Sequence, residues 1–141
     1  MLPDFLADLV KQQSYNPDNF FLIAGPCVVE SEEMVMEIAD KVSGICKRLE
    51  IPYIFKASYR KANRTSASSF TGLGDDLGLD LIKKVGTTFN LPTTSDVHAH
   101  DECAMAAEYI DILQIPAFLC RQTDLLLATA DTNKIVKLKK G

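Results

Sequence analysis

Short apolar runs alternate along the chain with longer segments in which apolar residues recur every three or four positions. The first run, residues 20–24, ends at Gly25 and Pro26 and predicts a buried strand that stops at a turn. Ser31 then precedes a segment with Ile, Val and Met at helical spacing. Glu32 and Glu33 in its first turn suit the positive end of a helix dipole, so we expect a helix to about residue 49.

The same order recurs along the rest of the chain, after a polar leader that ends at Asn19. Strict alternation of strand and helix predicts parallel β/α units, and therefore an α/β fold. A long polar loop, residues 61–74, separates the second strand from its helix. The further strands are expected at 53–58, 92–98, 111–116 and 135–140, and the further helices at about 76–89, 102–108 and 122–130.

Five strands and four helices can form either an open sheet or part of a closed (β/α)8 barrel, which takes eight of each over about 250 residues. No Gly-x-Gly-x-x-Gly follows the first strand, which disfavours a dinucleotide-binding sheet. Alternate residues of a strand share a face, and in every strand one face carries a polar or ligating group near the carboxyl end, where barrel enzymes place catalytic groups. These faces carry Ile23, Gly25 and Cys27; Ile54, Lys56 and Ser58; Thr94, Asp96 and His98; Ile112, Gln114 and Pro116; and Ile135, Lys137 and Lys139.

Composition narrows the class of protein. The 141 residues are 47% hydrophobic with a net charge of -4, which predicts one domain and disfavours nucleic acid as a partner. No apolar run approaches the ~18 residues of a spanning helix, and the first residues lack the pattern of a signal peptide, so we expect neither membrane nor export. Four cysteines without a Cys-x-x-Cys pair favour a reducing, cytoplasmic location.

Residues 56–69 carry four cations and no acidic residue within an acidic protein. Lysine and arginine bind phosphate and carboxylate through charged hydrogen bonds, so this segment predicts an anion site, with a solvated surface loop as the alternative. Another candidate is the path from Gln114 into the helix at 122–130, where free backbone amides can bind an anion. Thr123 and Asp124 there can equally be capping residues.

Cys27 follows the turn after the first strand and is either a buried structural cysteine or a metal ligand. Its nearest candidate partners by strand position are Asp96, His98 and His100. The pair His98 and His100 also resembles the strand-end histidines of metal-dependent hydrolases, which is a different interpretation of the same strand.

Five segments resemble the 3-deoxy-D-manno-octulosonate 8-phosphate synthase family, in the family's order and at its spacing. The most specific is Lys-Ala-Asn-Arg at 61–64, because the related synthase of the aromatic pathway has a Lys-Pro-Arg-Thr type of loop there. The segments are IAGPCVVES (23–31), FKASYRKANRTS (55–66), TSDVH (94–98), QIPAFLCRQTD (114–124) and VKLKKG (136–141).

The resemblance implies a (β/α)8 enzyme of lipopolysaccharide biosynthesis that condenses phosphoenolpyruvate with D-arabinose 5-phosphate, releasing phosphate by C–O cleavage. It assigns Lys61, Asp96 and Asn63 to catalysis, with Asp96 near the reacting carbons. The substrate-binding positions that it implies are Lys56, Lys61 and Gln114 for the carboxylate end of phosphoenolpyruvate, Lys139 and the Ala117 amide for its phosphate, Asn63, Arg64 and Thr65 for the pentose phosphate, and Arg121 for a contact with a neighbouring subunit.

A cysteine rather than an asparagine after Gly-Pro resembles the metal-dependent members, so Cys27 is expected to bind a divalent metal ion. The other ligands in the family, a His, a Glu and an Asp, belong to the second half of the barrel. We therefore expect residues 1–141 to be the amino-terminal part of one TIM-barrel domain, inactive alone and prone to associate, whereas the intact enzyme is expected to be a homotetramer. A non-catalytic half-barrel that only binds ligand is the alternative.

Overall fold

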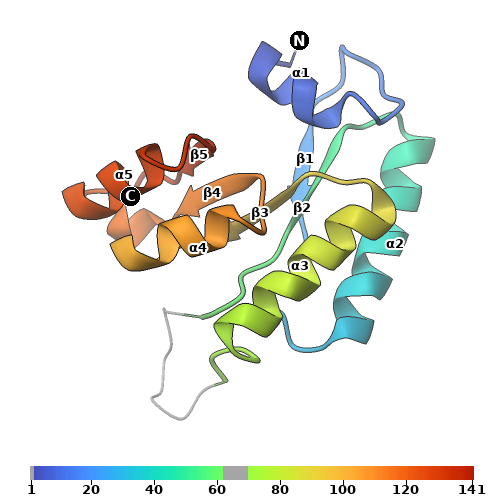
Figure 1. The fold of residues 1–141 in the computed structure, drawn as a ribbon. Helices are drawn as coiled ribbons and strands as arrows, with labels where there is room; N and C mark the ends of the chain where they lie inside the picture. The colour runs from blue at the N-terminus through green and yellow to red at the C-terminus, as the bar shows by residue number, and fades with distance from the viewer. Residues whose placement is uncertain (1, 62–69) are drawn as a thin grey trace.

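The computed structural model describes residues 2–61 and 70–141, and within them five parallel strands form one sheet in the order β1-β2-β3-β4-β5 (Figure 1). The expected α/β alternation is confirmed. The strands are β1 (Leu22–Ala24), β2 (Tyr53–Lys56), β3 (Thr93–Asp96), β4 (Ile112–Ile115) and β5 (Ile135–Leu138), and the helices are α1 (Asp4–Val10), α2 (Glu32–Arg48), α3 (Asp75–Phe89), α4 (Cys103–Ala107) and α5 (Thr123–Ala130), with 3₁₀ turns η1 (His100–Glu102) and η2 (Ala117–Leu119).

Each strand is shorter than the pattern predicted, because the ladder of paired hydrogen bonds ends where the chains begin to turn. Single backbone bonds continue past those ends: Ala57 N–H donates to Thr94, and Val97 N–H donates to Gln114. Lys139 N–H likewise donates to the carbonyl of Ile115. The extended direction therefore persists for one or two residues, so the alternation of side chains still holds beyond the regular strands.

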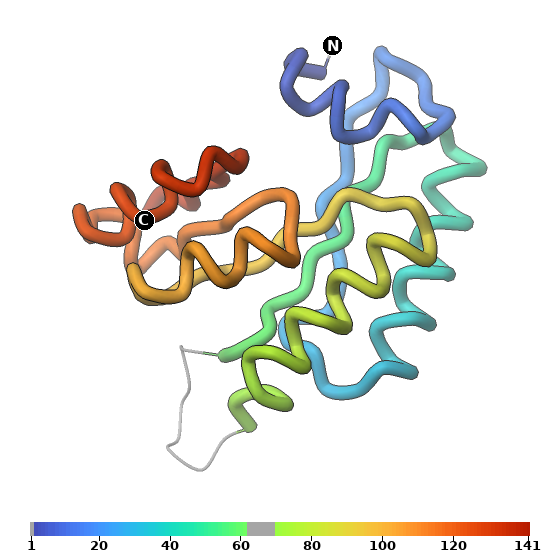
Figure 2. The backbone as a smooth tube through the Cα atoms, viewed as in Figure 1, coloured from blue at the N-terminus to red at the C-terminus, as the bar shows by residue number. Residues whose placement is uncertain are grey.

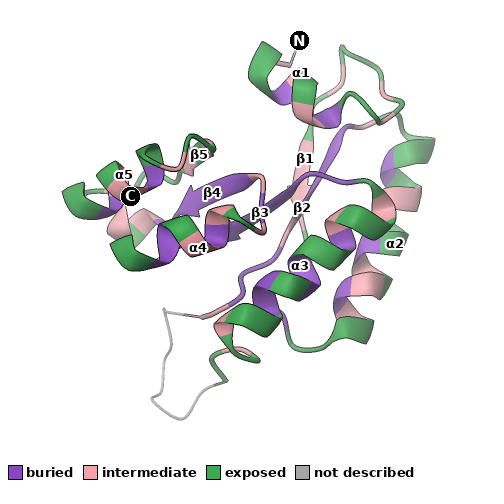
Figure 3. Cartoon of the chain, viewed as in Figure 1, coloured by how far each residue is buried: buried purple, intermediate pink, exposed green. Residues whose placement is uncertain are grey.

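Helices α2 and α3 lie side by side over β1 and β2, and the chain returns to the sheet after each helix (Figures 1 and 2). Ser31 begins α2 by accepting a hydrogen bond from Met34 N–H, and Asn90 ends α3 in a left-handed conformation, as expected of capping residues. The residues of the three central strands, β2, β3 and β4, are mostly buried, whereas those of β1 and β5 are only partly buried or exposed (Figure 3). The main core joins these strand residues to the apolar faces of the helices, for example Tyr53, Phe55, Leu113, Val35 and Ile82.

The opposite face of the sheet carries a second, smaller core near the amino ends of the strands. Leu6 and Val10 of α1 pack there against Ile54 and Ile112. The sequence pattern predicted a polar leader with no helix or strand up to Asn19, and this prediction is wrong for residues 4–10, which form α1. A helix of seven residues has too few turns for its apolar positions to show a clear helical period in the sequence. It is stabilised by this packing rather than by its own helix propensity.

Gly25 allows β1 and β2 to lie close together at their carboxyl ends. A Cβ atom at this position would lie 1.9 Å from the backbone oxygen of Lys56. Only a residue without a side chain permits that approach. The turn that the Gly-Pro pair predicted therefore also sets where Lys56 leaves the sheet.

No helix in the described ranges, 2–61 and 70–141, is long and apolar enough to cross a membrane.

Candidate active site

A pocket of about 440 Å³ lies at the carboxyl ends of the strands. Its lining confirms the alternation argument, because the polar residues predicted to share one face meet there. The residues from β2 to β5 and the segments that follow these strands are Lys56, Ser58, Asp96, His98, Gln114, Pro116, Lys137 and Lys139. Ile23 of β1 and Cys27, which follows β1, also line the pocket. Arg60, Lys61, Ala117 and Phe118 complete the lining.

Asp96 is the centre of hydrogen bonding in this pocket. Its carboxylate accepts hydrogen bonds from the Ser58 hydroxyl, at 2.5 Å, and from the side-chain amide of Gln114, and the Lys56 ammonium lies 3.4 Å away. Burial raises the pKa of Asp96, but the Ser58 hydrogen bond, the charge of Lys56 and the Gln114 hydrogen bond outweigh it and hold the pKa below its usual value. Asp96 is therefore a carboxylate at neutral pH, held rigidly between three strands.

The pocket contains more positive than negative charge. Asp96 is the only carboxylate in its described lining, and it pairs with Lys56. Lys61, Lys137 and Lys139 form no ion pair with any carboxylate in the described part of the chain. An anion with two or three negative charges would complement this surplus.

Glu102 anchors the chain on one side of the pocket, and sequence reasoning missed it. Its buried carboxylate accepts hydrogen bonds from the Tyr59 hydroxyl at 2.5 Å, from the Arg60 guanidinium and from His98 N–H at 3.1 Å. Arg60 also reaches Asp75 at 3.2 Å. The bonds from Tyr59 and Arg60 to Glu102 link segments some 40 residues apart, so no local sequence pattern predicts them. Glu102 also follows another acidic residue, Asp101, and nothing in the sequence distinguishes the two.

His98 lies against this network, nine-tenths buried. Its Nδ1 has no hydrogen-bond partner among the described residues, with the nearest Glu102 oxygen 3.8 Å away, and its ring meets the Tyr59 ring edge-on. Burial lowers the pKa of His98, and the charge of Asp96 opposes only part of that shift. The imidazole is therefore neutral at neutral pH.

The structure brings together some of the expected site residues and not others. Lys56, Lys61, Asp96, Gln114, Ala117, Lys139 and Cys27 all line the pocket. Arg121 is exposed just before α5 and does not line it, and His100 is exposed in η1. The expected pentose-phosphate residues Asn63, Arg64 and Thr65 lie outside the described residues.

Cys27 is exposed in the pocket, but the donors around it do not complete a metal site. In residues 2–61 and 70–141, no group of three or more His, Cys, Asp and Glu side chains lies close enough to hold one ion. Asp96 is already engaged by Ser58, Lys56 and Gln114. The described residues do not by themselves fit a divalent metal, so the role of Cys27 as a metal ligand stays a prediction.

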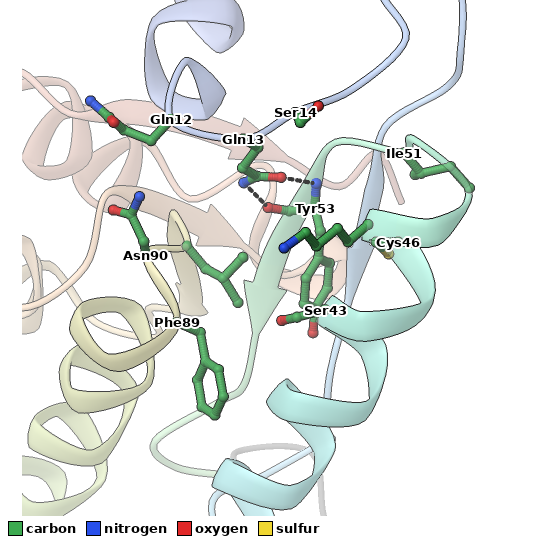
Figure 4. Close-up of a pocket in the computed structure, with 11 residues that line it drawn as sticks. Gln12, Gln13, Ser14, Ser43, Cys46, Ile51, Tyr53, Phe89 and Asn90 are labelled. Carbon is green, nitrogen blue, oxygen red and sulfur yellow. Dashed lines mark hydrogen bonds between the residues drawn. The ribbon is translucent and has the colours of Figure 1, made fainter.

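A second hollow, of about 220 Å³, lies at the other end of the strands, between α2, the end of α3 and the segment after α1 (Figure 4). The Gln13 side chain lines this hollow and hydrogen-bonds to both backbone groups of Tyr53. Its side-chain oxygen accepts a hydrogen bond from Tyr53 N–H at 2.8 Å, and its side-chain amide donates one to the Tyr53 carbonyl at 2.7 Å. The Gln13 side chain therefore makes the hydrogen bonds that a neighbouring strand would make at the start of β2. Its role is structural.

Comparison with known proteins agrees with this arrangement. Residues 11–141 match the model of the DAHP synthetase I family. A 2-dehydro-3-deoxyphosphooctonate aldolase of Koribacter versatilis (strain Ellin345) is 54% identical over 132 residues, which cover 94% of this chain and 48% of that protein. The aldolase of the same name from Rickettsia typhi (strain ATCC VR-144 / Wilmington) is 52% identical over 126 residues, which cover 89% of this chain and 46% of that protein.

The chain spans about half the length of the curated relatives it matches. The matched family has the TIM-barrel fold, and five parallel strands in sequential order with helices between them form part of such a barrel. The fold class predicted from the alternation of side chains is therefore confirmed. From this match, which covers nearly the whole sequence, we conclude that the chain belongs to the DAHP synthetase I family.

Proposed function

We propose that the protein containing this chain condenses phosphoenolpyruvate with D-arabinose 5-phosphate and water, giving 3-deoxy-D-manno-octulosonate 8-phosphate and phosphate. The relatives that are 52–54% identical carry the name 2-dehydro-3-deoxyphosphooctonate aldolase. Both substrates are phosphorylated, and phosphoenolpyruvate also carries a carboxylate. The reaction is a carbon–carbon bond formation, so the protein is a transferase.

The observation that carries this proposal is the surplus of cations at the carboxyl ends of the strands. Lys61, Lys137 and Lys139 face the pocket without carboxylate partners among the described residues, whereas Lys56 is paired with Asp96. A charged hydrogen bond to a substrate oxygen contributes roughly 1.5 to 3 kcal/mol. Three such lysines match the carboxylate and phosphate of one phosphoenolpyruvate.

The remaining pocket residues have roles that follow from their contacts. Gln114 is held by Asp96 and can orient a carboxylate beside Lys61. Ala117 begins η2, where backbone N–H groups lack partners within the helix, so its amide can bind the phosphate together with Lys139. Asp96 keeps its negative charge in the centre of the pocket and can stabilise positive charge that develops on the reacting carbons or hold a hydroxyl of the sugar.

The domain, the assembly and the metal are part of the same proposal. Residues 1–141 would form the amino-terminal part of a single TIM-barrel domain, and the enzyme would be a homotetramer with Arg121 at a subunit contact. The metal-dependent type rests on Cys27, an exposed thiol in the pocket, with its other ligands expected from a part of the barrel that this chain does not span.

The proposal is tested by measuring phosphate release from phosphoenolpyruvate with and without arabinose 5-phosphate, using the full product of the gene that encodes this chain. Release should require both substrates. Lys61→Met should reduce kcat/KM by about tenfold to a hundredfold, because one charged hydrogen bond is lost. Lys134→Met, an exposed lysine that does not line the pocket, is the matched control. Binding of phosphoenolpyruvate without turnover would favour the non-catalytic binding module instead.

The metal is tested separately by elemental analysis of the same protein and of Cys27→Asn. The expected result is a bound divalent ion in the unchanged protein and a lower metal content in the variant. Equal metal content in both would show that Cys27 is not a ligand. Hydrolysis that depends on metal and is lost on changing His98 and His100 would instead favour the hydrolase interpretation.

A further inference from the structure

Lys137 occupies a defined level of the sheet. The register pairs Asp96 of β3 with Gln114 of β4, and Gln114 with Lys137 of β5. Residues paired in this way have their side chains on the same face, so the three form one row across the pocket floor. Lys139 lies two residues further along the same face, nearer the pocket mouth. Lys137 therefore lies at the depth of Gln114, below Lys139.

The Lys137 side chain also differs from the other lysines at this end of the chain. Lys134 and Lys140 are exposed, whereas Lys137 is partly buried and lines the pocket. It forms no ion pair within the described residues. Asp96, the carboxylate in its row, already binds Lys56, Ser58 and Gln114.

A partly buried cation without a partner destabilises the protein unless an anion joins it. Burial lowers the pKa of Lys137, and the neighbouring charge of Lys139 lowers it further, while Asp96 acts in the opposite direction. Lys137 therefore occupies its place at a cost in free energy, which an anion bound in the pocket would offset.

We propose that Lys137 is a substrate-binding residue that contacts the carboxylate of phosphoenolpyruvate beside Gln114, while Lys139 above it contacts the phosphate. This inference rests on the proposed function and adds a residue that the family resemblance does not assign. Lys137 of β5 would contact the carboxylate end of phosphoenolpyruvate, and Lys139, which directly follows β5, would contact its phosphate end. This arrangement also gives a partly buried lysine an anionic partner.

The experiment measures the dissociation constants of phosphoenolpyruvate and of inorganic phosphate by calorimetry, for the full gene product and three variants. Lys137→Met should weaken phosphoenolpyruvate about tenfold to a hundredfold and leave inorganic phosphate within about twofold. Lys139→Met should weaken both ligands. Lys134→Met, the exposed control, should weaken neither.

Two results would overturn the inference while the proposed function stands. One is phosphoenolpyruvate affinity in Lys137→Met within about twofold of the unchanged protein. The other is an equal loss for both ligands, which would place Lys137 at the phosphate instead. If the unchanged protein binds no phosphoenolpyruvate, both this inference and the proposed function fail.

A measurement on the unchanged protein covers the case in which Lys137→Met does not fold. Acetic anhydride modifies lysine amines, and mass spectrometry of peptides reports the extent at each position. Phosphoenolpyruvate should protect Lys137 and Lys139 and leave Lys134 unprotected, whereas inorganic phosphate should protect Lys139 alone. Modification of Lys137 that is unchanged by saturating phosphoenolpyruvate would contradict the inference.

Discussion

Glu102 shows how one residue can hold two sides of a site together. Its carboxylate binds Tyr59 and Arg60, which immediately precede Lys61, and it also accepts from His98 N–H beside Asp96. Three donors around a buried carboxylate replace the water that it loses on folding. The positions of Lys61 and of the turn after β3 therefore depend on each other through this one side chain.

Replacing Glu102 with Ala should lower the free energy of unfolding by about 3 kcal/mol, because Tyr59 and Arg60 lose a buried partner. Urea unfolding of the purified protein measures this change. Glu108 is an exposed acid directly after the end of α4, so Glu108→Ala is the control and should change the free energy of unfolding by no more than about 0.5 kcal/mol. A loss at Glu102 no larger than at Glu108 would show that the network adds no stability.

His98 predicts a dependence of stability on pH. Burial lowers its pKa below the ordinary value of 6.5, so the unfolded chain binds a proton more readily than the folded protein. Stability should therefore fall as the pH drops below 6.5, whereas the lowered pKa of Asp96 acts only below 3.8. In His98→Gln the free energy of unfolding should change less between about pH 7 and about pH 5.

The comparison for this prediction is His100→Gln, which replaces an exposed histidine two residues away. Urea unfolding at several pH values should give the same slope for this variant as for the unchanged protein. A His98→Gln variant with that same slope would contradict the assigned environment of His98.

At the scale of elements, the contact between β1 and β2 depends on Gly25. Gly25→Ala would place a methyl group 1.9 Å from the Lys56 carbonyl oxygen, so the strand ends must separate. The expected cost is about 3 kcal/mol of unfolding free energy, with weaker binding of phosphoenolpyruvate because Lys56 moves. Calorimetry and urea unfolding measure the two effects.

Replacing Gly44 with alanine is expected to stabilise the protein, in contrast to Gly25→Ala. It lies inside α2, and the nearest atom to an added Cβ is the Arg48 guanidinium at 3.8 Å. Gly44→Ala should therefore raise the unfolding free energy by about 0.5 to 1 kcal/mol, since alanine favours helix. If both glycine variants had the same effect, the close approach at Gly25 would not be what limits that position.

The sequence pattern predicted elements and faces better than it predicted contacts. The alternation that placed Lys56, Asp96 and Gln114 on one face is a local property of each strand, and parallel pairing brings those faces together. The seven residues of α1 escaped notice because their order depends on packing against Ile54 and Ile112. The hydrogen bonds from Tyr59 and Arg60 to Glu102 join segments far apart in the sequence, so the spacing of residues along the chain does not predict them.

At the scale of the whole molecule, the charge is distributed unevenly. The protein has a net charge of -4, yet the described lining of the pocket holds five lysines and arginines and one carboxylate. The lysines and arginines of the pocket therefore attract anions to one end of the sheet, whereas the net negative charge of the chain as a whole repels them. The strength of this attraction depends on salt, because dissolved ions screen charges over about 10 Å at 0.1 M.

The expected result is a KM for phosphoenolpyruvate that rises several-fold between about 0.05 M and about 0.3 M sodium chloride, while kcat changes less. Steady-state kinetics at fixed, saturating arabinose 5-phosphate measures both constants. A neutral osmolyte such as sucrose is the control for general effects of cosolute. A KM that is independent of salt would argue against substrate binding by the surplus lysines.

The most direct test of the proposed condensation follows the bridging oxygen of phosphoenolpyruvate, between its enol carbon and phosphorus. The full product of the gene that encodes this chain is incubated with arabinose 5-phosphate and with phosphoenolpyruvate labelled there with oxygen-18. C–O cleavage predicts that the label leaves with inorganic phosphate, and that release requires the sugar phosphate. Label retained in the organic product, or release without the sugar, would contradict the proposed function.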